Sequence, residues 1–285
     1  INQRAVLATS TLVVFVIALN TTAINAAVNA LANDLGLETT TLAWALNAYV
    51  LAVATLVLPA GRLGDILGMR AVFLIGLGLF AAGTVLTALS QGGGMLIGGR
   101  ALQGAGAAFL MPASISALNL AFPPDQRGSA FGVWGAAAGI GFAVGPLYGG
   151  VWTDAASWRG IYWADLAMIG AAVLLSLRNL GPLPRPEGAP KLDLVGAAVL
   201  GVAILLIISA LQRGQDAGWE TLTVAGSLVA GAALVAVFAL VESRRAAPMV
   251  HLQLLRDRVY AAGNLATLLS TVSLFGFLFF FNLYA

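Results

Sequence analysis

Long apolar segments recur along the whole chain, separated by short polar, glycine or proline breaks. A helix needs about 20 residues to cross a hydrocarbon core of about 30 Å, and splitting the chain at its breaks gives nine candidates near that length. They run over 5–32, 42–61, 71–90, 95–121, 129–152, 161–179, 194–211, 220–241 and 260–284. Continuous runs such as 195–210 lack the period-two alternation of β-barrel strands. The pattern predicts an all-α, polytopic membrane helix bundle.

The composition excludes a soluble domain. Of the 285 residues, 60% are hydrophobic and 9% are charged, whereas a soluble domain has about a quarter charged residues. The chain has no cysteine and one histidine, His251, so disulfides, thiolate chemistry and most metal sites are excluded, and we expect neither a cofactor nor an enzyme. The net charge of +2 is spread over loops, which does not indicate nucleic-acid binding. The lipid bilayer is the partner that this composition indicates.

The loop charges predict the orientation, because cytoplasmic loops are enriched in Lys and Arg. With the amino terminus in the cytoplasm, eleven of the 14 cations lie inside and only Arg159 and Arg213 lie outside. The eleven are Arg4, Arg62, Arg70, Arg127, Arg178, Arg185, Lys191, Arg244, Arg245, Arg256 and Arg258. Five tryptophans fall at the predicted outer helix ends, as an aromatic belt requires: Trp44, Trp152, Trp158, Trp163 and Trp219. We therefore expect a plasma-membrane protein with a cytoplasmic amino terminus.

Two polar residues inside the fourth span are candidates for function. Arg100 and Gln103 are three residues apart and share one helix face. An arginine inside a span costs at least about 2.5 kcal/mol, so it is expected to face a polar cavity or an acceptor. The alternative is snorkelling, since Arg100 lies about five residues from the predicted outer end of its span.

The first span is apolar up to Leu19 and polar beyond it. Thr21, Thr22, Asn25 and Asn29 share one face, which is expected to line a cavity or contact another helix. Asn20 lies about 140° from Asn25 around the helix, at 100° per residue, and a role in linking helices suits it better.

Glycines mark two further sites. Between spans two and three, 61–70 predicts a tight cytoplasmic turn, in which Gly61, Gly68 and Arg70 accompany Asp65 as a possible latch; an ordinary capped turn is the alternative.

In span five, Gly141, Gly145 and Gly149 repeat every fourth residue and predict close packing of another helix, with a kink at Pro146.

Together these stretches resemble the major facilitator superfamily, specifically its 14-span drug/proton antiporter branch. The motifs that carry the resemblance are 59–70, 100–106, 122–128 with 139–150, and Trp158–Arg159 before span six. The resemblance implies an amino-terminal six-helix bundle at 1–180, a proline-rich linker at 181–193 and two extra helices at 194–242. It also implies that 243–285 holds a cytoplasmic segment and the first helix of a second bundle.

Two departures from that family's pattern concern proton coupling. Asn20 stands where the branch usually has an acid, and an amide cannot titrate. Asp165 stands where asparagine is usual, so it is a candidate for proton coupling together with Arg100, whose counterpart the family links to that role. The alternative is that Asp165 is an interfacial carboxylate near the headgroups.

The resemblance implies efflux of amphipathic or cationic small molecules by alternating access, driven by inward proton flow. The cavity would be lined by Thr21, Thr22, Asn25 and Asn29, with Arg100 and Gln103 as its polar cluster. The alternative is a transporter-derived scaffold or assembly subunit without transport of its own. Alternating access needs two bundles, so we expect that the chain requires a missing carboxy-terminal half or a partner membrane chain.

Overall fold

The computed structural model describes residues 2–179, 193–245, 248 and 252–284, most of them helical. They form two compact units, Ile1–Leu234 and Val235–Ala285. The helices of the first unit are α1 (Gln3–Ala26), α2 (Val28–Leu35), α3 (Thr39–Leu67), α4 (Met69–Ala88), α5 (Gly93–Ala121), α6 (Pro124–Ala155), α7 (Arg159–Asn179), α8 (Leu194–Ala217) and the first half of α9 (Leu222–Ser243). The second unit contains the rest of α9, the 3₁₀ helix η1 (Leu252–Arg256) and α10 (Arg258–Tyr284).

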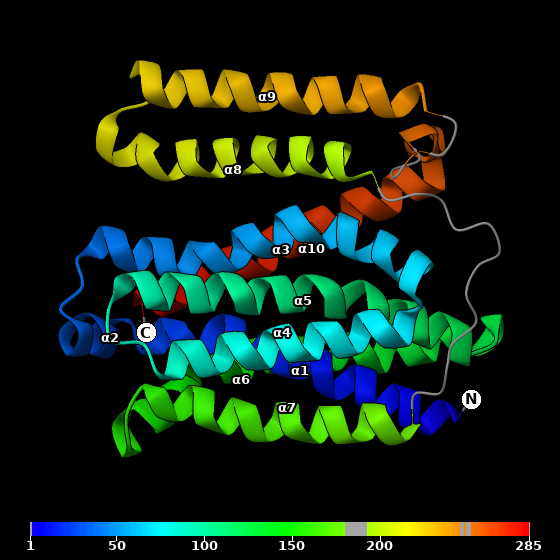
Figure 1. Ribbon diagram of the computed structural model, residues 1–285, viewed down its shortest axis with the longest axis horizontal. Helices are drawn as coiled ribbons and strands as arrows, with labels where there is room; N and C mark the ends of the chain where they lie inside the picture. Colours follow the sequence, from blue (N-terminus) through cyan, green and yellow to red (C-terminus); the bar gives the residue numbers. More distant parts are fainter. Residues whose placement is uncertain (1, 180–192, 246–247, 249–251, 285) are drawn as a thin grey trace. The chain divides into compact units, whose positions relative to one another are not determined.

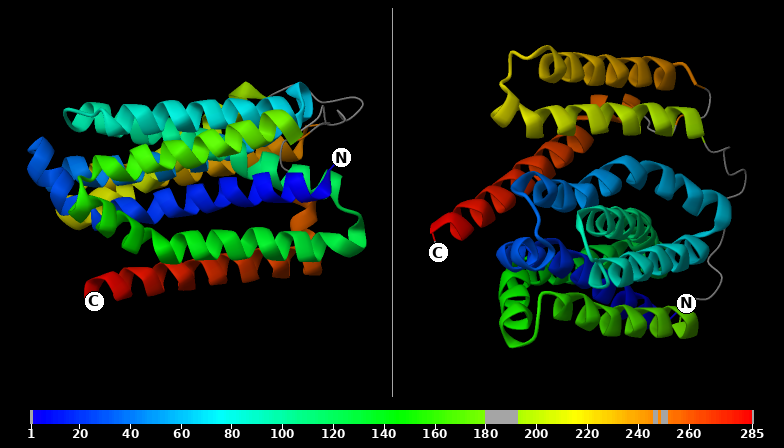
Figure 2. Two further views of the ribbon diagram at one scale, coloured as in Figure 1. Left: turned by 90° about the horizontal axis from the view of Figure 1, so that it is seen from below. Right: turned by 60° about the vertical axis from the view of Figure 1, so that its left-hand side comes forward.

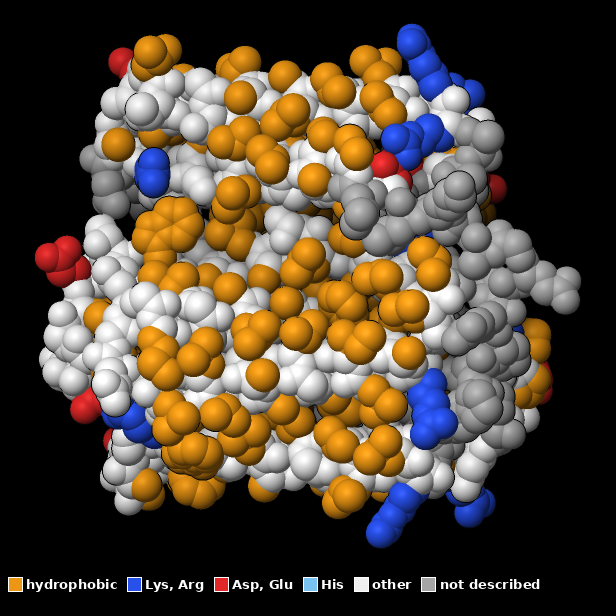
Figure 3. Space-filling model, in the orientation of Figure 1, with side chains coloured by type: hydrophobic (Ala, Val, Ile, Leu, Met, Phe, Trp, Pro, Cys, Tyr) orange, Lys and Arg blue, Asp and Glu red, His pale blue; other side chains and the backbone are white. Residues whose placement is uncertain are grey.

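The long helices α1 and α3 to α7 run nearly parallel to one line, with successive helices in opposite directions (Figure 1), and the views in Figure 2 keep this arrangement. The start of α1, the α3–α4 turn and the α5–α6 turn therefore meet at one end of the bundle. On the face shown in Figure 3, hydrophobic side chains cover the middle of the helices, and Lys and Arg side chains lie toward the ends. This is the distribution expected of a surface that faces lipid.

The prediction of an all-α membrane bundle is confirmed. Within the described residues, eight helices are long and apolar enough to span a membrane: α1 and α3 to α9. The predicted ninth span corresponds to α10, but most of its side chains from residue 274 onward lie outside the described part, so that span stays a prediction. Most of the predicted linker and His251 also lie outside it.

The predicted first span, 5–32, is wrong in one respect, because the helix is interrupted at Ala27. The Ala27 amide bonds to the carbonyl of Ile24, three residues back, and α2 begins at the next residue. Leu31 of α2 is buried in a cluster with Leu42 of α3 and Trp158. α2 therefore packs as a separate short helix, and Gly36 ends it with φ of 61°, a conformation that favours glycine.

The predicted turn at 61–70 is also shorter than expected. α3 continues to Leu67 and α4 starts at Met69, so Gly68 alone makes the connection. Its φ of 89° lies in the region that glycine enters without steric cost. Gly61 and Gly64 are tolerated inside α3 and do not end it.

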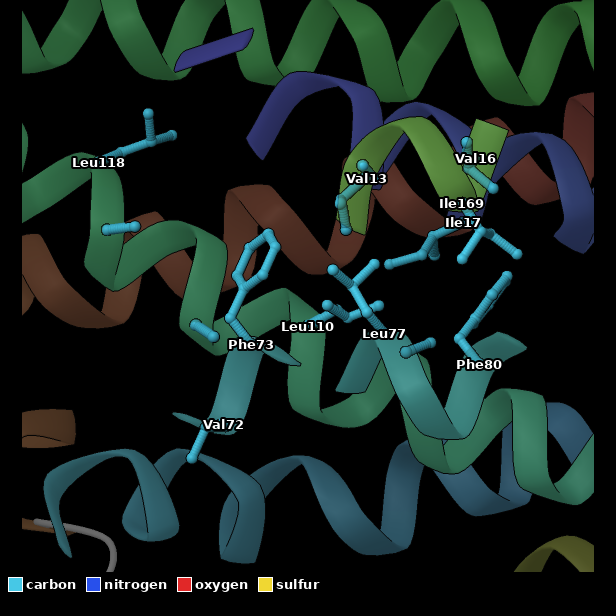
Figure 4. Packing of buried hydrophobic residues seen from close by; sticks show 14 of the residues in the cluster. Val13, Val16, Ile17, Val72, Phe73, Leu77, Phe80, Leu110, Leu118 and Ile169 are labelled. Atoms are coloured by element: carbon cyan, nitrogen blue, oxygen red, sulfur yellow. The ribbon is translucent and has the colours of Figure 1, made fainter. Parts of the chain in front are cut away.

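The core of the bundle lies between α1, α4, α5 and α7. Figure 4 shows side chains from these four helices pointing toward one another, among them Val13, Phe73, Leu110 and Ile169. α5 packs against α1, α3, α4 and α6.

Close approach of α5 to its neighbours depends on small residues. A Cβ at Gly104 would overlap the Tyr49 carbonyl oxygen of α3, and one at Gly106 would overlap the Phe80 amide of α4. This approach brings the polar residues of α5 within reach of the adjacent helices.

Candidate functional site

Arg100 lies at the centre of the candidate site. It is 1% exposed, and its NH1 donates to Asn20 Oδ1 at 2.6 Å and to Gln103 Oε1 at 2.9 Å. Its guanidinium lies over the Tyr49 ring, 4.5 Å from the centroid, in a cation–π contact. The snorkelling alternative is therefore wrong, because the charge turns inward to acceptors on neighbouring helices.

Asn20 connects this arginine to a carboxylate. Its Nδ2 donates to Asp165 Oδ2 at 2.6 Å while its Oδ1 accepts from Arg100. Arg100 and Asp165 form no direct ion pair in the described part of the chain. The amide therefore separates a buried cation from a buried acid and hydrogen-bonds to both.

Asp165 is fully buried, with 0% exposure, although it lies in the second turn of α7. Its Oδ1 accepts a hydrogen bond from the Tyr148 hydroxyl of α6 at 3.0 Å, and its Oδ2 accepts from α1. The carboxyl therefore faces α1 and α6 and not the surface of the unit, whereas its depth in the membrane stays a prediction.

Gln103 extends the site toward α4. Its Nε2 donates to Thr84 Oγ1 at 2.9 Å, and the Thr84 hydroxyl donates in turn to the Phe80 carbonyl at 2.7 Å. Arg100, Gln103, Asn20 and Asp165, each at most 1% exposed, are called here the central polar cluster.

The predicted cavity face of span one is not found as a single surface. Thr22 is buried, and its hydroxyl donates to the Phe142 carbonyl of α6 at 3.1 Å, so it contacts a helix instead of lining an open cavity. Thr21 is half-buried and bonds to its own helix at Ile17. Asn25 and Asn29 are exposed, and the break at Ala27 places Asn29 on α2.

The glycine stripe of α6 lies against α1. A Cβ at Gly141 would come within 2.7 Å of the Phe15 carbonyl oxygen, and at Gly145 and Gly149 it would overlap Thr22 and the Ala23 backbone. By contrast, a Cβ at Gly139 would meet nothing within 4 Å.

Pro146 lies within this stripe and carries no amide hydrogen for the Phe142 carbonyl, four residues earlier. The Thr22 hydroxyl donates to that carbonyl instead.

At the other predicted site, Gly61, Gly68 and Arg70 surround the α3–α4 connection, where Arg70 is half-buried. The side chain of Asp65, the proposed latch, lies outside the described residues.

A second arginine–aspartate contact lies at the opposite end of the bundle. Arg159 forms an ion pair with Asp34 of α2 and donates to the Ser90 carbonyl at 2.9 Å, and Trp158 Nε1 donates to Asp34 at 3.0 Å. The hydrogen bonds from Arg159 and Trp158 hold the pKa of the Asp34 carboxyl below its usual value of 3.8. We call Asp34 and Arg159 the peripheral ion pair.

Trp158 was predicted to belong to the interfacial belt, and this is wrong. Its side chain is 2% exposed, because it is held by Asp34 and packs edge-on against Tyr162. Trp163 and Trp219, about half exposed, keep the exposure expected of a belt.

Within the central polar cluster, Asp165 is the group that can take up a proton, because amides do not titrate and an arginine stays charged. With Asp165 ionised, Arg100 and Asp165 together are neutral, and one bound proton makes the pair +1. Buried ionisable residues in a span are costly and are typical of proton and substrate pathways. Sequence reasoning singled out Arg100, Gln103 and Asp165 and gave Asn20 a role in linking helices, but it did not identify the residues that Asn20 links, and it missed Tyr148.

The sequence matches a known family and resembles several transport and resistance proteins. Residues 10–285 match the model of the Major Facilitator Superfamily. The chain is 35% identical over 253 residues to the probable actinorhodin transporter of Streptomyces coelicolor, covering 86% of the chain and 43% of that protein. It is 36% identical to the puromycin resistance protein of Streptomyces alboniger (94% and 53% covered) and 31% identical to the tetracenomycin C resistance and export protein of Streptomyces glaucescens (95% and 50%).

A solved peptide transporter has a similar fold, with a TM-score of 0.63 at 19% identity over 86% of this chain and 52% of that one. The chain spans about half the length of the curated relatives that it matches. With its helical bundle and a family match over nearly all its residues, the chain belongs to the Major Facilitator Superfamily.

Proposed function

We propose that the protein containing this chain exports amphipathic or cationic small molecules across the plasma membrane by alternating access, driven by inward proton flow. The observation that carries the proposal is the buried chain of hydrogen bonds from Arg100 through Asn20 to Asp165. The names of the relatives, which include antibiotic resistance and export proteins, support export of small molecules.

In this proposal Asp165 binds and releases the proton, and Arg100 supplies the fixed positive charge beside it. A bound proton leaves the central polar cluster at +1, which disfavours a cationic substrate nearby, whereas release of the proton favours it. Competition between proton and cation for one site is the simplest physical basis for antiport. Gln103 holds the arginine in place from α5.

The transport cavity needs a second wall. Alternating access involves two bundles that move around a site at their interface. We propose that a second bundle, from further residues of the same protein or from another membrane chain, completes the cavity beside Thr21, Asn25 and Asn29. Gly61, Asp65, Gly68 and Arg70 would form the cytoplasmic gate.

Asp165→Asn tests the proton site. In proteoliposomes with an imposed pH gradient, this variant of the complete transporter is expected to lose gradient-driven flux of a fluorescent amphipathic cation and to retain its thermal stability. Asp154→Asn, an exposed acid at the end of α6, is the control and is expected to transport normally. The double variant Asn20→Asp/Asp165→Asn is expected to regain flux, because the acid is restored on α1 next to Arg100. Full flux from Asp165→Asn alone contradicts the proposal.

The second candidate is a membrane scaffold without transport, and the amide at Asn20 favours it, since the acid usual at that position is missing. Absence of any gradient-driven flux from the complete wild-type protein, at normal abundance, supports this scaffold function.

The proposed orientation has its own test. The chain has no native cysteine, so single cysteines at Ala189 and Ala217 can be labelled in intact cells. Only Ala217 is expected to react, because a cytoplasmic amino terminus places that loop outside.

A further inference from the structure

The hydroxyl of Tyr148 lies within hydrogen-bond distance of two acceptors on α7. It is 3.0 Å from Asp165 Oδ1 and 3.1 Å from the carbonyl oxygen of Ile161, one turn earlier on the same helix. A phenol has one proton, so it can donate to only one of them at a time. The choice between the two depends on whether Asp165 carries a proton.

The surrounding hydrogen bonds determine which oxygen of Asp165 can be protonated. A guanidinium only donates, so Asn20 must present its carbonyl oxygen to Arg100 and its NH₂ group to Asp165. Oδ2 therefore accepts from an N–H group that can only donate, whereas the hydroxyl at Oδ1 can either donate or accept. Oδ1, which faces Tyr148, is the oxygen left to take the proton.

The groups that face or lie near Asp165 come from α1, α3, α5, α6 and α7. Asn20 of α1 and Tyr148 of α6 hydrogen-bond to the carboxyl, and Arg100 of α5 lies beyond Asn20. The phenols of Tyr49 on α3 and Tyr162 on α7 are buried close enough to interact electrostatically. The Tyr162 hydroxyl makes no hydrogen bond within the described part of the chain, so Tyr148 is the phenol that contacts the acid.

We propose that Tyr148 is a positioning residue that senses the charge of Asp165 and transmits it to α6, an inference that rests on the proposed proton coupling. With Asp165 ionised, Tyr148 donates to Oδ1. When a proton from solution binds Oδ1, the new O–H donates to the Tyr148 oxygen, and the phenol turns its own proton to the Ile161 carbonyl. Tyr148 keeps its proton throughout, and the net change is one proton on Asp165.

The place of Tyr148 in α6 gives this switch a mechanical consequence. Tyr148 directly precedes Gly149, which packs against the backbone of α1. Tyr148 is only half-buried, whereas the central polar cluster is fully buried, so it also lies between the acid and the surface of the unit. A change in its hydrogen bonding therefore acts between α6 and α7, one residue before the glycine that packs against α1.

Tyr148→Phe removes the hydroxyl and keeps the ring that packs edge-on against Trp152. In the complete transporter, this variant is expected to lose the dependence of transport on pH while its thermal stability stays close to the wild type. Tyr162→Phe is the matched control, because it deletes a buried hydroxyl that makes no hydrogen bond in the described residues; its pH profile is expected to match the wild type. A wild-type pH profile in Tyr148→Phe overturns the inference.

Infrared difference spectra of the same protein between acid and neutral pH give a second readout that does not need transport. The tyrosine C–O band is expected to shift, and the shift is expected to disappear in both Tyr148→Phe and Asp165→Asn but persist in Tyr162→Phe. A shift that survives in Tyr148→Phe also overturns the inference. If Asp165→Asn transports with a normal pH profile, the proposed proton site is wrong. If Asp165→Asn is defective while Tyr148→Phe has a normal pH profile, only the proposed role of Tyr148 is wrong.

Discussion

The first unit contains two arginine–aspartate clusters with similar residues in opposite settings. In the peripheral ion pair, Arg159 and Asp34 touch directly and are 31% and 47% exposed. In the central polar cluster, Arg100 and Asp165 are buried and an amide, Asn20, lies between them. The peripheral pair acts as a local contact between α2 and α7. The direct partners of the buried acid are Asn20 and Tyr148, so in the proposed mechanism a proton binds without breaking an ion pair.

The largest difference is expected from deleting the bridge. Asn20→Leu removes one hydrogen-bond partner from each buried charge, and the free energy of unfolding should fall by roughly 3–5 kcal/mol, as when a buried pair loses a partner. Asn25→Leu, five residues away and exposed, is the control and should change stability little. Denaturant titration in mixed micelles, followed by tryptophan fluorescence, measures both. Equal losses of unfolding free energy in Asn20→Leu and Asn25→Leu would mean that the buried cluster contributes no more to stability than an exposed asparagine.

The same substitution in both clusters sharpens the comparison. Arg100→Lys should lower the free energy of unfolding by about 1.5–3 kcal/mol, because an ammonium cannot reproduce hydrogen bonds and ring stacking made by one planar guanidinium. Arg159 also lies over a ring, that of Trp158, but its contacts are partly exposed to solvent, so Arg159→Lys should cost less than about 1 kcal/mol. The same unfolding titration compares the two variants, and a larger loss in Arg159→Lys would reverse the comparison.

The smallest effect concerns acid. Because the pKa of Asp34 is lowered in the folded protein, its contacts stabilise the fold at pH values above its usual 3.8 and lose that contribution as the pH falls through the lower folded value. Wild type and Asp34→Asn should therefore differ slightly at neutral pH and converge in acid. Added salt should reduce the difference at neutral pH, since exposed charges are screened. Thermal unfolding at several pH values and salt concentrations checks both expectations, and a difference that grows in acid would contradict them.

Hydropathy was sufficient to predict the eight long apolar helices of the described residues, because lipid requires long apolar runs whatever their neighbours are. The spacing of Arg100 and Gln103 was sufficient to place them on one face, because residues three positions apart in a helix lie on the same side. The ends of elements were less predictable. The packing of α2 beyond the break at Ala27 involves residues distant in sequence, and α3 continues past Gly61 and Gly64 to Leu67.

The partners across helices could not be predicted from the sequence alone. Asn20 was set apart because it does not share the face of Asn25, yet the face it does occupy is the one that meets Asp165. Asp165 lies near the start of α7, and only its rotation toward α1 and α6 makes it a buried acid. Tyr148 lies among the glycines of α6, and its contact with Asp165 spans 17 residues, so no local pattern marks it.

The contact between Thr22 and Phe142 affects how easily α6 can bend. A helix that bends at an ordinary residue must stretch one of its own backbone hydrogen bonds. At Pro146 that hydrogen bond does not exist, because proline has no amide hydrogen. The acceptor there is bonded by a hydroxyl on the neighbouring helix, which can follow a change of angle by rotating about one side-chain torsion. Gly145 leaves room for that hydroxyl, so α6 can bend at Pro146 while it stays in contact with α1. The two helices should therefore change their mutual tilt at this point without unwinding.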